Sequence, residues 1–304
     1  MIPKTIIIIT GPTAVGKTSL AIDLARQYNT SIISADSRQC FQELNIGVAK
    51  PPRVHLEEIP HFFINSHVIT QEVHAGTFEG YAMDAVSRIF SERDIAIMAG
   101  GTGLYIRAFC EGLDSIPQIP AGVRQQIVAQ YAQSGMEWLH QEVEKKDPLF
   151  FAEGEIRNPQ RLMRALEVMI YTGKSIREFQ QQKKITRNFS MLKIGLELDS
   201  DLLKRNIQHR VDEMIEKGLA GEVRQLITYR GLNALRTVGY TELFEHFDGK
   251  ISLNEAIEKI KANTRAYAKR QMTWFKKDKE ITWFDARNVD DVKKWVELKL
   301  KIKN

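Results

Sequence analysis

The segment GPTAVGKT, residues 11–18, has the residue types and spacing of a phosphate-binding loop. It matches the pattern G-x-x-x-x-G-K-[ST] through Gly11, Gly16, Lys17 and Thr18. In such a loop, backbone N–H groups point at phosphate oxygens, the lysine adds a positive charge, and the threonine hydroxyl can bind Mg²⁺. The sequence therefore predicts a phosphate site, for which ATP is the default occupant.

Two more polar clusters follow predicted strands. Asp36 ends the apolar run TSIISAD, and GGTGLY, which contains Thr102, follows the run DIAIMAG. Carboxyl ends of parallel strands meet at one edge of a sheet, so we expect both clusters to lie beside the phosphate loop. Asp36 could then hold Mg²⁺ through water or accept a proton from a substrate. No Asp or Glu directly follows DIAIMAG, where a nucleoside triphosphatase usually keeps its second Mg²⁺ carboxylate.

Strands alternating with helices predict an α/β fold with a parallel sheet. The pattern changes after the Pro/Gly segment PQIPAGV, and residues 123–184 are predicted to be helical. Asn158, Pro159 and Gly173 bound the clearest helix, with Leu162, Leu166 and Met169 on its apolar face. We therefore expect residues 1–117 to begin the core, residues 118–190 to form an all-helical insertion domain, and residues 191–304 to complete the core.

A basic stripe is predicted on the long helix near the C-terminus, which opens with the capping box Ser252 and Glu255. Four-residue spacing places Lys261, Arg265 and Lys269 on one face, and only Asp278 opposes this charge nearby. Arg270, Lys276 and Lys277 add charge, with Tyr267, Trp274 and Phe275 among them. Clustered cations with aromatic residues are typical of nucleic-acid surfaces, although the aromatic residues could equally belong to the core.

Composition limits the possible classes of protein. The 304 residues carry a formal charge of +5, with 43% hydrophobic and 27% charged residues, as in ordinary globular proteins. Two cysteines, Cys40 and Cys110, are too few for a disulfide framework, and the chain has neither a signal-peptide pattern nor a 20-residue apolar run. We therefore expect a cytoplasmic protein that does not bind membranes, and we expect a monomer.

In its motifs the chain resembles the tRNA dimethylallyltransferases, also called tRNA isopentenyltransferases. The resemblance rests on GPTAVGKT, SADSRQ, IGVAKP, AGGTGLYIRA, NPQRLMRALEV with TGKS, RTVGY and TRAYAKRQMTWFKK, in this order over nearly the whole chain. It implies a P-loop NTPase-like core with a helical insertion that helps to hold the anticodon stem-loop of tRNA. It also implies transfer of a dimethylallyl group from dimethylallyl diphosphate to the exocyclic amine of the adenine 3′ to the anticodon.

The resemblance assigns roles to particular residues. Asp36 would be the general base, Thr102 and Lys17 would be catalytic, and Thr18 would bind Mg²⁺, with Asp36 reached through water. The residues expected to bind the diphosphate of the donor are Gly11, Pro12, Thr13, Ala14, Val15, Gly16, Lys17 and Thr18. Those expected to contact tRNA are Asp36, Ser37, Arg38, Gln39, Thr102, Arg124, Gln160, Arg161, Leu162, Met163, Arg164, Lys269, Arg270, Gln271 and Lys276.

Three alternative functions stay open at this point. A small-molecule kinase would use Lys17, Thr18 and Asp36, but it leaves the insertion and the basic helix unexplained. A non-catalytic RNA-binding module would explain the basic helix but not the phosphate loop. An enzyme that prenylates free adenine nucleotides would use the same core. The helical insertion argues against this alternative and in favour of tRNA.

Overall fold

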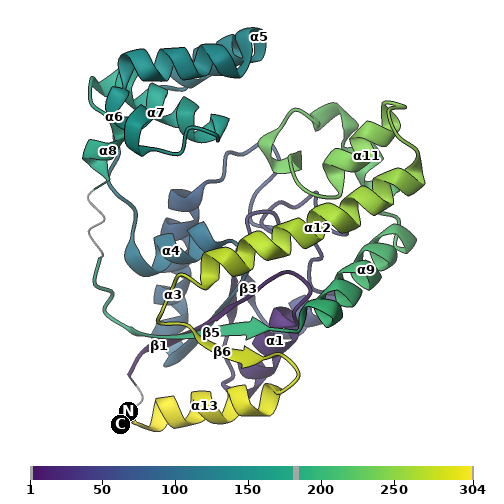
Figure 1. Ribbon diagram of the computed structural model, residues 1–304. Helices are drawn as coiled ribbons and strands as arrows, with labels where there is room; N and C mark the ends of the chain where they lie inside the picture. Colours follow the sequence, from purple (N-terminus) through teal and green to yellow (C-terminus); the bar gives the residue numbers. More distant parts are fainter. Residues whose placement is uncertain (1–2, 181–184, 303–304) are drawn as a thin grey trace. The chain divides into compact units, whose positions relative to one another are not determined.

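The computed structural model describes residues 3–180 and 185–302 (Figure 1). Residues 181–184 of the predicted insertion, and residues 1–2 and 303–304 of the predicted core, lie outside the described part of the chain. The chain divides into two compact units. We call Met1–Cys110 with Thr186–Asn304 the core unit, and Glu111–Ile185 the helical unit.

The core unit is built on one six-stranded sheet with the order β3-β2-β4-β1-β5-β6, in which every paired strand is parallel. Its strands are β1 (Thr5–Thr10), β2 (Ile32–Ser34), β3 (His61–Phe62), β4 (Ile95–Ala99), β5 (Ser190–Glu197) and β6 (Thr282–Asp285). Its helices are α1 (Lys17–Gln27), α2 (Arg53–Glu58), α3 (Ala75–Glu92), α4 (Gly103–Glu111), α9 (Ser200–Glu216), α10 (Leu219–Gln225), α11 (Tyr240–Phe247), α12 (Leu253–Phe275) and α13 (Val289–Ile302). Two 3₁₀ turns, η1 (Ile227–Tyr229) and η2 (Asn233–Leu235), precede α11.

Alternation along β1 divides the interior of the core unit into two layers. Ile7 and Ile9 face a cluster that includes residues of α1 and α13. Ile6 and Ile8 face a second cluster, with residues of α3, α4 and α9 to α12. All four isoleucines are fully buried, as expected for a strand in the middle of a parallel sheet with helices on both faces. This packing fixes the carboxyl end of β1, where the phosphate-binding loop begins.

The helical unit has its own core and consists of helices in its described residues. These are α5 (Ala121–Lys146), α6 (Pro148–Glu153), α7 (Pro159–Thr172) and α8 (Ile176–Phe179). Asn158 caps α7 as predicted, since its side chain accepts hydrogen bonds from the backbone of Gln160 and Arg161, and Gly173 ends the helix at φ 69°. Packing places the borders of this unit at residues 111 and 185, earlier than the 118 and 190 expected from the sequence.

The fold class expected from the sequence is confirmed: a P-loop-like α/β core carries an insertion whose described elements are all helices. The predicted strands before the phosphate loop, before Asp36 and before GGTG are β1, β2 and β4, and they lie next to one another in the sheet. Within the described residues, no helix is long and apolar enough to cross a membrane.

Candidate active site

A cavity of about 640 Å³ opens at the carboxyl ends of β1, β2 and β4. Its walls come entirely from the core unit: the loops that follow these three strands, the loop 47–49, helices α9 and α12, and the segment 236–242. The three polar clusters predicted to converge therefore share one cavity. They do so for the reason expected from the sequence, because the loops that follow adjacent parallel strands lie at the same edge of the sheet.

The phosphate-binding loop forms one wall of this cavity. Thr13 to Thr18 line it, whereas Gly11 and Pro12 are buried behind them. Gly11 has φ 140°, and a Cβ atom there would lie 2.6 Å from the carbonyl oxygen of Leu196, so only glycine fits. Gly16, at φ 104°, precedes α1. The N-terminus of α1 thus faces the cavity and favours an anion there.

Lys17 lies in this loop and forms no ion pair with any residue that the structure describes. Its Nζ donates hydrogen bonds to the carbonyl oxygens of Gly11 at 3.0 Å and Pro12 at 2.6 Å. The pKa of Lys17 is lowered to about 7, mainly by burial and also by the nearby Arg210, while Asp36 partly offsets the shift. A bound diphosphate would supply the negative charge that this site lacks.

Arg210 is a cationic residue of the site that the motifs did not indicate. It comes from α9, lines the cavity, and donates a hydrogen bond to the hydroxyl of Thr13 at 3.1 Å. Asn206, one helical turn earlier, donates to the carbonyl oxygen of Ala14 at 3.2 Å. The pKa of Arg210 is lowered by burial. Helix α9 therefore both supports the phosphate-binding loop and adds a second positive charge beside Lys17.

Asp36 lies at the next strand end and is held by its own loop. Its Oδ1 accepts hydrogen bonds from the backbone N–H groups of Arg38 at 2.8 Å and Gln39 at 3.2 Å. Among the described residues, Oδ2 accepts no hydrogen bond. Asp36 lines the cavity together with Ser37, Arg38 and Gln39. One carboxylate oxygen is thus anchored, and the other can receive a proton or a water molecule.

Thr102 connects the third strand end to the loop of Asp36. Its Oγ1 accepts a hydrogen bond from the Ser37 backbone at 3.0 Å, and its own N–H donates to the carbonyl oxygen of Ala35 at 3.1 Å. A Cβ atom on Gly100 would lie 2.1 Å from that same oxygen, which explains the glycine. Gly100 and Gly101 line the cavity. The Thr102 hydroxyl keeps its proton for donation.

Two glutamines expected to contact RNA line the cavity and also form hydrogen bonds inside the protein. Gln271 of α12 is buried, accepts a hydrogen bond from the Thr13 backbone at 2.8 Å, and donates one to the carbonyl oxygen of Gly101 at 2.9 Å. The Gln39 amide accepts from the Ser34 hydroxyl at 3.0 Å and donates to the carbonyl oxygens of Val48 and Ala49, both at 3.2 Å. Gln271 therefore joins two loops of the site, and Gln39 joins two others. The sequence could not show the role of Gln271, because its bonds to Thr13 and Gly101 cross between distant segments.

The far wall of the cavity was also missed by sequence reasoning. Arg236 and Thr237 belong to the motif RTVGY, to which no role had been given, and both line the cavity with Glu242. Glu242 is buried, and its carboxylate accepts hydrogen bonds from the Gly239 backbone at 2.8 Å and the Asn263 amide at 2.6 Å. The pKa of Tyr267, on α12, is raised to about 12, mainly by burial and also by Asp36.

In the helical unit, the expected RNA-contacting residues divide into two groups. Arg124 and Arg164 share the buried Glu167, at 2.6 and 3.1 Å, and Arg124 also donates to the Gln160 amide at 3.1 Å. Arg161 is exposed. The expectation that Leu162 and Met163 contact RNA is wrong. Both are buried in the core of the unit, where they are 0% and 2% exposed, so they cannot contact RNA.

The prediction of an unopposed basic stripe on α12 is also corrected. Acidic residues of another helix and of a strand pair with two of its lysines. Lys261 is only 14% exposed and pairs with Asp212 of α9 at 2.8 Å and Glu258 at 3.1 Å. Lys276 pairs with Glu197 of β5 at 2.6 Å. Asp278, thought to oppose the stripe, pairs instead with Lys193 at 2.8 Å. Lys269 and Arg270 remain exposed, and Arg270 also lines the cavity.

The lowered pKa of Lys17 predicts that anion binding is coupled to proton uptake. At pH 8 a lysine with a pKa of about 7 is mostly neutral, and a bound diphosphate would raise that pKa. We expect pyrophosphate binding to take up about one proton more in the wild type than in Lys17→Arg, whose guanidinium is always charged. Affinity should fall as the pH rises above 7. Calorimetry in buffers of different ionisation enthalpy measures the uptake, and equal uptake by both proteins would contradict the assignment.

Comparison with known proteins shows which sequences and structures the chain is similar to. Residues 39–278 match the family model described as IPP transferase. A tRNA dimethylallyltransferase 1 from Bacteroides thetaiotaomicron is 42% identical, with 97% of this chain and 96% of the relative covered. The tRNA isopentenylpyrophosphate transferase of Bacillus halodurans has a similar structure, with a TM-score of 0.72, 32% identity, and coverage of 99% and 98%. A eukaryotic dimethylallyltransferase, seen in crystals acting on tRNA, has a TM-score of 0.77, 27% identity, and coverage of 93% and 74%.

Proposed function

Because the chain belongs to the IPP transferase family, we propose that it transfers a dimethylallyl group from dimethylallyl diphosphate to tRNA. The acceptor is the exocyclic amine of the adenine 3′ to the anticodon. The observation that carries this proposal is that the phosphate-binding loop and the Asp36 carboxylate line one cavity. A diphosphate leaving group requires a phosphate-binding loop, and an amine that must lose a proton requires a base beside that loop.

The acceptor side of the reaction belongs to Asp36. An adenine amine cannot be reached while the base is stacked, so the base must leave the anticodon loop and enter the cavity. The amine nitrogen bonds to the first carbon of the dimethylallyl chain, and Asp36 takes its proton. The hydrogen bonds that fix Oδ1 keep the carboxylate in place. The Thr102 hydroxyl is positioned by Ser37 beside this loop and can donate a hydrogen bond.

The donor side belongs to the phosphate-binding loop. As the bond between the carbon and the diphosphate oxygen breaks, its electron pair leaves with the diphosphate, whose charge Lys17, Arg210 and the loop N–H groups stabilise. The exposed Thr18 hydroxyl and the Asp36 carboxylate share the cavity, and such oxygen ligands fit Mg²⁺. When bound there, Mg²⁺ would neutralise part of the charge on the leaving group.

RNA contacts are proposed for cationic side chains on both units. Arg124, Arg161 and Arg164 present charge on the helical unit, and Lys269 and Arg270 do so on α12. Such contacts fix the position of the RNA without reading its sequence. That the enzyme acts as a monomer stays a prediction.

An experiment with labelled donor separates this proposal from its alternatives. The protein is incubated with dimethylallyl diphosphate, labelled in the dimethylallyl chain, and with either tRNA or AMP. We expect label in tRNA and none in AMP, and with ATP present we expect no formation of ADP. Label in AMP would support an enzyme acting on free nucleotides. ADP formed in step with turnover would support the kinase, and an unlabelled RNA that nevertheless binds would support the non-catalytic module.

The ion pairs on α12 sharpen the prediction for RNA affinity. Lys269 is exposed and has no acidic partner among the described residues. Lys269→Gln should therefore remove a phosphate contact. The plot of the logarithm of the RNA association constant against the logarithm of salt concentration should become less steep by about 0.7–0.9. Lys261→Gln is the matched control, because Lys261 is already paired with Asp212. Its salt slope should stay close to that of the wild type. Binding measured over a salt series tests both, and equal slopes for Lys269→Gln and the wild type would exclude this contact.

A further inference from the structure

We propose that Glu222 of α10 is a positioning residue that holds the loop of Asp36 in its reactive place, an inference that rests on the proposed function. Its carboxylate accepts hydrogen bonds from three successive backbone N–H groups. Oε2 accepts from Asn45 at 3.1 Å and Ile46 at 2.7 Å, and Oε1 accepts from Gly47 at 3.1 Å. A carboxylate that binds three consecutive N–H groups fixes the conformation of the backbone between them.

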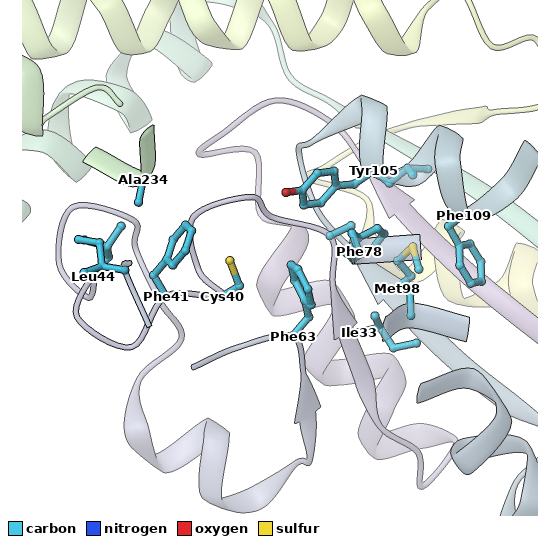
Figure 2. Packing of buried hydrophobic residues seen from close by; sticks show 14 of the residues in the cluster. Ile33, Cys40, Phe41, Leu44, Phe63, Phe78, Met98, Tyr105, Phe109 and Ala234 are labelled. Carbon is cyan, nitrogen blue, oxygen red and sulfur yellow. The ribbon is translucent and has the colours of Figure 1, made fainter. Parts of the chain in front are cut away.

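The Tyr240 ring completes this anchor. Its hydroxyl donates to Oε1 of Glu222 at 2.5 Å, and burial together with Glu222 raises the pKa of Tyr240 well above its usual range. The loop lies directly on this ring, since a Cβ atom on Gly47 would be 2.5 Å from Tyr240 Cε2. Just before the anchor, Phe41 and Leu44 are buried in the same cluster as Ala234, and Figure 2 shows these three side chains near one another.

The anchored loop is connected to the base by a short chain of hydrogen bonds. Gly47, Val48 and Ala49 line the cavity. The carbonyl oxygens of Val48 and Ala49 both accept from the Gln39 side chain, and the Gln39 backbone N–H donates to Asp36 Oδ1 at 3.2 Å. Glu222 thus reaches Asp36 through the loop 45–49 and Gln39, without touching the substrate.

This arrangement separates Glu222 from the donor site. In the described residues, the hydrogen bonds of its carboxylate reach the loop 45–47 and Tyr240, and none reaches the phosphate-binding loop. Loss of the anchor should displace Asp36 and leave the binding of the diphosphate unchanged. Because displacements of about 1 Å in a catalytic group can cost about 10²-fold in rate, the effect should appear in kcat.

The test compares Glu222→Gln with Tyr240→Phe and the wild type. In either orientation, the glutamine amide turns an N–H group toward at least one backbone N–H donor of the loop, so the anchor is weakened. Tyr240→Phe removes only the hydroxyl and leaves the three loop bonds in place. We expect kcat to fall about 10- to 100-fold in Glu222→Gln and to stay within about threefold in Tyr240→Phe. The affinity for pyrophosphate, measured by calorimetry, should be unchanged in both.

Hydrogen exchange provides the readout that does not depend on activity. Amides 45–47 and the segment 36–41 should exchange faster in Glu222→Gln than in the wild type, and Glu222→Ala serves if the glutamine variant fails to fold. Faster exchange with an unchanged kcat, or unchanged exchange in both segments, would overturn the proposal. If the wild type itself transfers no label to tRNA, the proposed function fails, and the exchange and pyrophosphate measurements still decide whether Glu222 holds the Asp36 loop.

Discussion

The Asp36→Asn variant is expected to transfer the dimethylallyl group roughly 10²–10⁴-fold more slowly than the wild type, the usual contribution of general acid–base catalysis. The replacement is closely matched to the structure. The asparagine oxygen can still accept the hydrogen bonds that Asp36 Oδ1 receives from Arg38 and Gln39, so the loop should keep its conformation. The amide nitrogen that replaces Oδ2 cannot accept a proton from the adenine amine.

The measurement pairs turnover with binding on one preparation. The affinity for tRNA should change far less than the rate of transfer, because Asp36 acts in the transition state and contributes little to RNA binding. Glu242→Gln is an informative comparison, because Glu242 is a second carboxylate that lines the same cavity but has both oxygens engaged with Gly239 and Asn263. Near-normal turnover by Asp36→Asn would show that Asp36 has a structural role or acts only through Mg²⁺.

The Lys17→Ala variant is expected to be slower by about 10²-fold or more, the scale for losing one group that stabilises developing charge. Lys17 is the charged side chain of the phosphate-binding loop itself, and Arg210 remains beside this loop in the variant. The loss should appear in kcat and in the affinity for pyrophosphate, because the diphosphate carries charge both before and after transfer.

Single-turnover rates and pyrophosphate affinity check this second prediction, with Lys17→Arg as the control that keeps the charge. The wild-type side chain donates to the carbonyl oxygens of Gly11 and Pro12, so thermal unfolding should be compared as well, to separate a disturbed loop from a missing charge. A folded Lys17→Ala variant with the wild-type rate at saturating substrates would contradict a donor site in this loop.

The sequence predicted the placement of those candidate residues that depends on strand ends. Lys17, Asp36 and Thr102 each follow a buried strand, and the parallel arrangement of β1, β2 and β4 is sufficient to bring them together. The ends of α7 were also predictable, because Asn158 and Gly173 act locally. The two-residue strand β3 was not, since so short a pairing leaves no periodic pattern.

Other parts of the site depend on tertiary packing that no local pattern encodes. Arg210 and Glu242 line the cavity but belong to helices far in sequence from the phosphate-binding loop. Asp212 of α9 pairs with Lys261 of α12. Leu162 shows a different limit, since its spacing correctly predicted an apolar face while the motif suggested an RNA contact. The chemical pattern marks a segment as functional, but burial decides which of its side chains can touch a ligand.

The central claim is that this cavity joins a dimethylallyl group to one exocyclic amine of tRNA. It is tested most directly with two synthetic anticodon stem-loops, one carrying adenine 3′ to the anticodon and the other carrying purine, which lacks that amine. Both are incubated with the protein, Mg²⁺ and dimethylallyl diphosphate labelled in the dimethylallyl chain. Our account predicts label in the adenine stem-loop and none in the purine stem-loop. Equal labelling of the two RNAs, or no label in either while both bind the protein, would contradict it.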